Sequence, residues 1–348
     1  MGLSGCASYW SQGRQDGGRK VVVYTPFPNA AAQALAEAFQ ARTGIAVEQN
    51  LDSTTKILAR LRIEKRWPRC DVWYSGGGMV PFMTAAQEDL LDPYVPPEWR
   101  HLPYKRGALV MRDRAWRWSP LAIVSLGFCY NPQVLQGEAI PRRWEDLTQP
   151  RFRGQIEMWD PSDSGTSMLF LEASLQRYLA TPGGEEAGWR YLKAIYANLK
   201  RYTVEGKPAF AVARGECQIG LQFESQYLEF LEQQFLNRQL GQGARHLAWY
   251  LPEQSPVLVD GIALIKGAPH PQEGRQFIDF CLSLEGQKII NRYFFSINPQ
   301  LPPPPGLEGI DLETLLERAQ PLDPQWMADN YDRVRQRWQN EVEASIEV

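Results

Sequence analysis

The sequence predicts an α/β protein of two lobes joined by a hinge, and three features of the chain lead to this expectation. Short apolar strands alternate with amphipathic helices, which is the pattern of β/α units. Two sets of such units lie on either side of a proline-rich and aromatic segment at 93–120. A later strand at 256–265 returns to the first set, so the chain crosses twice between the lobes. The 348 residues are enough for two domains.

Four parts of the chain are expected from this pattern. They are a polar tether at 1–19, a first lobe at 20–121 with 258–300, a second lobe at 122–257, and a C-terminal part at 301–348 in which a proline-rich spacer precedes a helix packed on a lobe.

The first set of units predicts three strands and two helices. Strands are expected at 20–24, 43–48 and 70–74, and helices at 32–41 and 53–67. This alternation predicts a parallel sheet of the doubly wound type, in which ligands lie beyond the carboxyl ends of strands. The loops at 25–28, 52–54 and 75–78 fall at such ends.

The second set begins with a long strand that leaves the first lobe. Strands are expected at 122–130, 155–159 and 217–221, and helices at 167–179, 185–197 and 226–236. After the returning strand, helices at 271–292 dock on the first lobe, and a last helix is expected at 324–342.

Composition excludes several classes of function. The 37 basic and 40 acidic residues nearly cancel without a cationic block, so nucleic acid is not an expected partner. No uncharged apolar run reaches the roughly 18 residues of a membrane span. The sequence has no G-x-S-x-G or H-E-x-x-H motif, so we expect binding rather than catalysis, and no cofactor.

Five cysteines and three histidines are scattered without metal-ligand spacing. Most of the four cysteines after Cys6 are expected to be buried small hydrophobic residues, and one disulfide among them is left open. Five tryptophans are expected to pack in the interior, namely Trp67, Trp73, Trp144, Trp189 and Trp338.

Residues 3–6, Leu-Ser-Gly-Cys, resemble the lipobox of bacterial lipoproteins. The resemblance implies that Cys6 is lipidated and that the protein is anchored at the periplasmic or extracellular face of the cytoplasmic membrane. A chance match of four residues is the alternative.

Ordered blocks along the chain resemble bacterial extracellular solute-binding proteins of the branch that binds ferric ion, phosphonates and sugar phosphates. The blocks include 22–24, 43–45, 90–94, 144–154, 212–216, 260–268 and 277–287. The resemblance implies a periplasmic-binding-protein fold of the second type, which closes by a hinge around one small solute. It also implies a monomer that delivers this solute to an ABC permease, and a sensor of a membrane signalling partner is an alternative.

The iron ligands of the ferric branch are replaced in this chain. Pro28 stands where that branch has a histidine, Gly76 where it has a glutamate, and Ser225 and Gln226 where it has two tyrosines. The resemblance therefore favours a solute that carries an oxyanion, with a ferric ion or another metal complex as the alternative.

The segment at 160–167 is the main candidate for ligand contact. A strand end leads into a helix whose first turn carries hydroxyls and a glycine, and free N–H groups at a helix start bind anions. The candidates are Ser162, Ser164, Gly165 and Thr166. A simple N-cap role is the alternative.

Further candidates lie in the other loops. In the first lobe they are Thr25 and Phe27 on the floor, Ser53 and Thr54 at a helix start, and Ser75, Gly76 and Gly77 after a strand. Gln222, Glu224, Tyr227 and Asp260 are expected at the far end of the ligand, where acids suit a zwitterion. Alternatively, Phe27 is a buried hydrophobic residue of the interior, and the other four side chains have a surface or hinge role.

Overall fold

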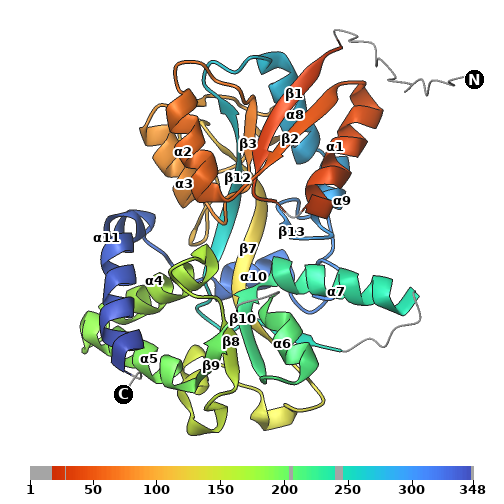
Figure 1. Cartoon of the computed structure of the whole chain (residues 1–348). Helices are drawn as coiled ribbons and strands as arrows, with labels where there is room; N and C mark the ends of the chain where they lie inside the picture. Colours follow the sequence, from red (N-terminus) through yellow and green to blue (C-terminus); the bar gives the residue numbers. More distant parts are fainter. Residues whose placement is uncertain (1–17, 28, 204–206, 240–245, 346–348) are drawn as a thin grey trace, which may run out of the picture.

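The protein folds into two lobes that lie one above the other in Figure 1. The computed structural model describes residues 18–27, 29–203, 207–239 and 246–345. The α/β architecture that the sequence predicts is confirmed. None of the described helices is long and apolar enough to span a bilayer.

The first lobe is built from elements at the start of the chain and from a later return. Its strands are β1 (Lys20–Thr25), β2 (Ala46–Leu51), β3 (Val72–Tyr74), β4 (Leu91–Asp92), β5 (Lys105–Arg106), β6 (Leu109–Val110) and β13 (Phe295–Ser296). Its helices are α1 (Asn29–Thr43), α2 (Thr54–Glu64), α3 (Val80–Gln87), α8 (Pro271–Leu282) and α9 (Leu284–Ile290).

The second lobe contains the middle of the chain. Its strands are β8 (Ile156–Met158), β9 (Leu199–Tyr202), β10 (Ile219–Phe223) and β11 (Ala248–Tyr250). Its helices are α4 (Gly165–Leu179), α5 (Gly184–Asn198), α6 (Pro208–Arg214) and α7 (Glu224–Gln239). After the return come α10 (Leu312–Arg318) and α11 (Pro324–Arg337).

Two long strands, β7 (Ser119–Tyr130) and β12 (Val257–Ile265), connect the lobes. The main strand order among the described residues is β2-β1-β3-β12-β7-β10-β8-β9. Strand β7 pairs with β12 through its first half and with β10 through its second half. Every residue of β7 and β12 is buried, so these strands form the common core of both lobes.

The sheet is mixed: strands are parallel within each set of β/α units, as predicted, and the two crossing strands are antiparallel to their neighbours. Strands β1, β2 and β3 are parallel to one another, as are β8, β9 and β10. Strands β7 and β12 are antiparallel to each other, and each is antiparallel to the neighbour in its own lobe. The reason is that these two strands carry the chain between the lobes in opposite directions.

Most predicted elements exist, with shifted ends. The second strand is at 46–51 rather than 43–48, because Gly44 adopts a positive φ of 71° just after α1. The short elements α3, α6 and β9 are absent from the prediction.

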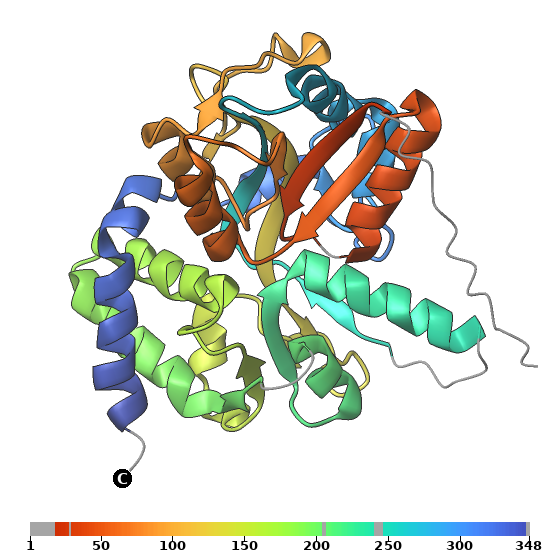
Figure 2. The same ribbon diagram turned by 45° about the horizontal axis from the view of Figure 1, so that its top comes forward.

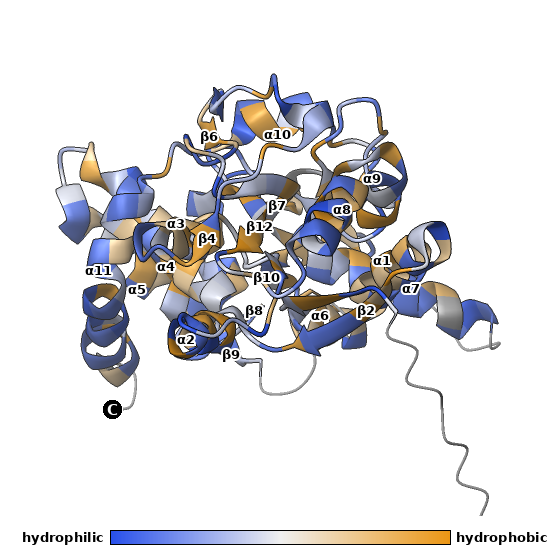
Figure 3. Ribbon diagram, turned by 90° about the horizontal axis from the view of Figure 1, so that it is seen from above, coloured by the Kyte–Doolittle hydropathy of each residue, from blue (hydrophilic) through white to orange (hydrophobic). Residues whose placement is uncertain are grey.

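The C-terminal helix α11 packs along the second lobe beside α4 and α5 in both views (Figures 1 and 2). Most residues of this helix are hydrophilic (Figure 3). Arg333 forms an ion pair with Glu185 at 2.6 Å, and Arg337 with Glu186 at 2.7 Å. Beyond the helix, Trp338 is fully buried and its indole donates to the hydroxyl of Tyr202.

The four described cysteines are free and buried, so no disulfide links Cys70, Cys129, Cys217 and Cys281. Four of the five tryptophans expected in the interior are buried there. The prediction for Trp67 is wrong, since its side chain is 83% exposed in the turn after α2. Cys6 lies outside the described residues.

Candidate functional site

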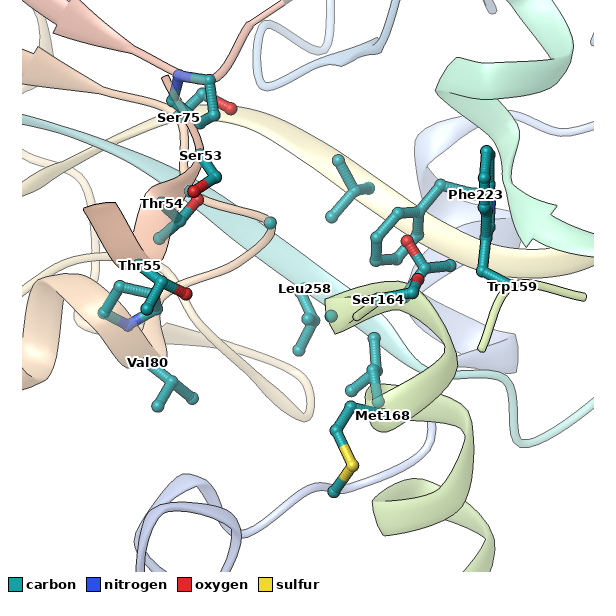
Figure 4. Close-up of a pocket in the computed structure, with 18 of the residues that line it drawn as sticks. Ser53, Thr54, Thr55, Ser75, Val80, Trp159, Ser164, Met168, Phe223 and Leu258 are labelled. Atoms are coloured by element: carbon teal, nitrogen blue, oxygen red, sulfur yellow. The ribbon is translucent and has the colours of Figure 1, made fainter. Parts of the chain in front are cut away.

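A cleft of about 1510 Å³ lies between the lobes. Figure 4 shows Ser53, Thr54 and Ser75 on one side of it and Ser164 and Met168 on the other. Residues of α2, α3, α4 and α11 line it, together with Val124 and Leu258 of the crossing strands. The loops at the ends of parallel strands therefore meet at one cavity, as the sequence predicts.

The second-lobe wall is the start of α4. The hydroxyl of Ser164 accepts a hydrogen bond from the N–H of Ser167 at 3.3 Å, so Ser164 is the N-cap. The next two residues, Gly165 and Thr166, line the cleft. Their N–H groups come before the first helical hydrogen bonds and have no acceptor among the described residues. They are available to an anion at the positive end of the helix dipole.

The first-lobe wall is the start of α2. Ser53 is the N-cap residue, but its side chain makes no capping hydrogen bond. Ser53, Thr54 and Thr55 all line the cleft. Their hydroxyls, together with the N–H groups of the first turn, form a second set of donors that faces the same cavity.

The glycine-rich loop after β3 is occupied by a carboxylate of the protein itself. Asp260 is buried on β12 and accepts hydrogen bonds from the hydroxyl of Ser75 at 2.7 Å, from the N–H of Gly76 at 3.1 Å and from the N–H of Gly78 at 2.7 Å. Burial raises the pKa of Asp260, and these donors oppose that rise. The loop amides are therefore used to fix the loop to the crossing strand.

The charged side chains of the cleft are mostly acidic. Two bases line it, and both are paired, Arg62 with Glu88 and Lys207 with Glu229. The six carboxyl groups in the lining are Asp160, Asp163, Glu172, Glu229, Asp260 and Asp332.

Nine of the predicted residues lie together in the lining. They are Ser53, Thr54, Ser75, Gly76, Gly77, Ser164, Gly165, Thr166 and Asp260.

Three other predicted residues lie under the cleft or beside it. The hydroxyl of Thr25 accepts from the N–H of Phe27 at 3.0 Å. The ring of Phe27 is buried and stacks on that of Phe294, which does line the cleft. The hydroxyl of Ser162 accepts from the side-chain amide of Gln339.

The predicted residues near β10 have structural partners. Gln222 accepts from the N–H of Ala209, and the hydroxyl of Tyr227 donates to the carbonyl of Leu247. Glu224 is fully buried and accepts from both the N–H and the hydroxyl of Ser125 on β7. Burial raises the pKa of Glu224 to about 8. These three side chains do not line the cleft.

Several lining residues are absent from the sequence prediction. Glu172 of α4 and Tyr331 of α11 are the clearest examples, with Met327 and Asp332 beside Tyr331 on the same helix. The sequence predicts this helix and its packing on a lobe, but it gives no signal that the helix lines the cleft, because that depends on contacts between residues far apart in the chain.

Three of the four positions that correspond to the ferric ligands lie in the cleft lining. Gly76, Ser225 and Gln226 line the cleft, and Pro28 lies outside the described residues. Within the described ranges, no group of three or more His, Cys, Asp or Glu side chains is placed to hold a metal ion.

Two α/β lobes around a cleft lined by helix starts define a solute-binding protein. Residues 78–326 match the family model described as bacterial extracellular solute-binding protein, and the chain belongs to this family. The family resemblance and the two-lobed α/β fold that the sequence predicts are thus confirmed.

Similar proteins have different ligands in their names. The periplasmic binding protein AfuA from Actinobacillus pleuropneumoniae, solved with fructose-6-phosphate, is 26% identical, has a TM-score of 0.73, and covers 94% of this chain and 99% of its own. A putative 2-aminoethylphosphonate-binding periplasmic protein of Salmonella paratyphi A is 24% identical over 83% of this chain and 80% of its own. Iron-bound HitA from Pseudomonas aeruginosa, 22% identical with a TM-score of 0.74 over 91% of this chain and 98% of its own, shows the same fold.

Proposed function

We propose that this protein is the solute-binding component of an ABC importer and that its solute carries a phosphate, phosphonate or similar oxyanion. The observation that carries the proposal is the pair of helix starts, α2 and α4, that line one cleft from opposite lobes. Each supplies N–H groups without helical acceptors and the positive end of a helix dipole. An oxyanion between them would satisfy donors from both lobes at once.

Two similar proteins support this choice of ligand class. AfuA is described with fructose-6-phosphate bound, and the Salmonella relative is named for 2-aminoethylphosphonate. Both molecules carry a phosphorus oxyanion. Ferric ion is less well supported, since Gly76, Ser225 and Gln226 offer no anionic oxygen at the positions where the ferric branch binds iron.

We propose that the solute favours closure of the lobes by binding both walls. Strands β7 and β12 are the crossings about which the lobes would rotate, and the limits 20–121 with 258–300 and 122–257 are the proposed rigid parts. A ligand that contacts both lobes binds the closed state more tightly and thereby shifts the population toward it. No covalent chemistry is required.

We also propose a lipid anchor at Cys6 and a membrane permease as the partner. Cys6 would carry lipid, and the segment before β1 would tether a monomer to the outer face of the cytoplasmic membrane, near the permease. Labelling of cells with radioactive palmitate tests this, because Cys6→Ser would remove the label from the protein expressed from its natural gene.

Calorimetric titration tests the ligand class. Inorganic phosphate, methylphosphonate, fructose-6-phosphate and ferric citrate would each be titrated into the purified protein. We expect at least one oxyanion to bind and to raise the melting temperature. Binding of ferric ion with none of the oxyanions would overturn the proposal.

The variant Gly165→Leu tests whether the solute binds at the start of α4. An added Cβ at Gly165 meets no atom within 4 Å, so the side chain would enter the cleft beside the free N–H groups without disturbing the fold. We expect at least a tenfold loss of affinity, equivalent to about 1.4 kcal/mol. The matched control is Gly309→Leu, which also meets no atom within 4 Å and lies outside the cleft lining.

A further inference from the structure

The cleft lining contributed by α4 and α11 includes a buried acidic group with one oxygen that has no hydrogen-bond partner among the described residues. Glu172 lines the cleft on α4 but is only 3% exposed. Its Oε1 atom has no hydrogen-bond partner. Most buried polar atoms in folded proteins are paired, and an unpaired one costs free energy. A donor that comes with the solute would remove this cost.

The other carboxyl groups of the lining differ from Glu172 in this respect. Asp260 accepts hydrogen bonds from three donors, Glu229 pairs with Lys207, and Asp332 pairs with Arg335 at 3.1 Å. Asp160 accepts from the N–H of Ser162. Asp163 is exposed to water. Among the described lining residues, Glu172 is therefore the buried carboxyl with an oxygen that has no partner.

The residues around Glu172 suit a cationic group that is attached to an alkyl chain. Met168 precedes it by one helical turn on α4, and Met327 and Tyr331 line the same cleft from α11. Thioethers are soft and adaptable, and a tyrosine ring attracts cations. Burial raises the pKa of Glu172 to about 8, and a bound ammonium group would lower it again by favouring the carboxylate.

We propose that the solute carries an ammonium group that binds Glu172 between α4 and α11, in addition to the oxyanion at the start of α4. This inference rests on the proposed function and makes it more specific, since the solute becomes a zwitterion. The acidic lining of the cleft agrees with it, because both bases that line the cleft are already paired with carboxylates. The positive charge in the site is supplied by the solute.

The helix sets the distance between the two charges of the solute. Gly165 and Glu172 are seven residues apart on α4, which is about 10 Å along the axis. Side chains lean toward the helix start, so the carboxyl lies closer to Gly165 than this figure. An amine two carbons from phosphorus is too short to reach both ends, whereas one six carbons away is long enough.

Isothermal titration calorimetry with five model compounds tests the inference. They are aminoethylphosphonate, ethylphosphonate, ω-aminohexylphosphonate, hexylphosphonate and 1,6-diaminohexane. In the wild-type protein, we expect ω-aminohexylphosphonate to bind at least tenfold more tightly than hexylphosphonate. The difference between aminoethylphosphonate and ethylphosphonate should be much smaller. We expect Glu172→Gln to abolish that gain and to leave hexylphosphonate binding within about twofold, a difference of about 0.4 kcal/mol.

The matched control is Glu253→Gln, which removes an exposed carboxyl outside the cleft lining and should retain the full gain. Circular dichroism and the melting temperature would establish that each variant is folded. The inference would be overturned if the terminal amine did not raise the affinity of the wild-type protein, or if it raised the affinity of the wild type and of Glu172→Gln equally. Either result would leave the oxyanion proposal intact. Binding of diaminohexane through Glu172 without binding of any phosphonate would overturn the oxyanion proposal and retain the ammonium site. If none of the five compounds binds, both are overturned.

Discussion

The hydroxyl of Ser75 donates a hydrogen bond to a carboxylate oxygen of Asp260 at 2.7 Å, although 185 positions separate the two residues. Ser75 directly follows β3 of the first lobe, and Asp260 lies on β12, the strand that returns from the second lobe. Ser75 adopts a positive φ of 62°, which is uncommon for a residue with a side chain. The contact fixes one wall of the cleft to a crossing strand.

Replacement of Asp260 by alanine should loosen this wall. The hydroxyl of Ser75 and the N–H groups of Gly76 and Gly78 would all lose their acceptor, at a cost of about 1–3 kcal/mol for each donor that stays buried and unpaired. We expect urea denaturation to show a loss of at least about 2 kcal/mol. Asp329→Ala, at an exposed site on α11, should change stability by less than about 0.5 kcal/mol. Equal effects of the two variants would mean that the Asp260 contacts do not stabilise the fold.

Neighbouring glycines in the same loop should respond differently to alanine. Gly77 has a φ of +70° and open space around its Cβ position, so Gly77→Ala should cost about 1–2 kcal/mol from backbone strain alone. A Cβ on Gly78, at a φ of +117°, would lie 2.6 Å from Cδ1 of Leu258. Overpacking adds a cost of about 1–3 kcal/mol, so the melting temperature of Gly78→Ala should be well below that of Gly77→Ala. The reverse order would contradict the loop geometry.

Stability should fall as pH rises through the range in which Glu224 titrates. Burial raises the pKa of Glu224 from 4.5 to about 8, so the folded state holds a proton that the unfolded state has released between these values. This contribution is fully present below about pH 4.5 and is lost as the pH rises toward 8. Each unit of pKa difference corresponds to about 1.4 kcal/mol.

Glu224→Gln should remove much of this dependence, because an amide oxygen still accepts from Ser125 but does not ionise. Urea denaturation at pH 5, 6, 7 and 8 measures it, with the exposed Glu253→Gln as the control that keeps the wild-type slope. Parallel pH profiles for all three proteins would show that Glu224 does not titrate in this range.

A buried and an exposed tryptophan together test how much the segment after α11 contributes to stability. Trp338 is fully buried and its ring lies edge-on to Tyr196, so Trp338→Ala should cost about 3–5 kcal/mol. Trp67 is 83% exposed, and Trp67→Ala should change stability by less than about 0.5 kcal/mol. Chemical denaturation compares the two variants directly. A small effect of Trp338→Ala would mean that the segment after α11 contributes little to the fold.

Much of the cleft was predictable from local pattern. Hydroxyl and glycine residues at strand ends and helix starts identified Ser53, Ser75, Ser164 and Gly165, because these residue types favour such positions for backbone reasons. The pattern could not show that Asp260 occupies the amides of the glycine loop, since that depends on the register of β12. It also could not show that Glu224 and Tyr227 form hydrogen bonds with Ser125 and Leu247 and are not part of the cleft lining.

The sequence by itself determined the α/β class, the order of the main strands and helices, and the membership of the solute-binding family. These follow from periodicity and from blocks of neighbouring residues, which are local properties of the chain. Only the tertiary structure decided the pairing of β7 with β12, the place of α11 beside α4, and the burial of Glu172 with an unpaired oxygen. Such features arise from contacts between residues far apart in the chain, and their free energies depend on burial and pairing that exist only after folding.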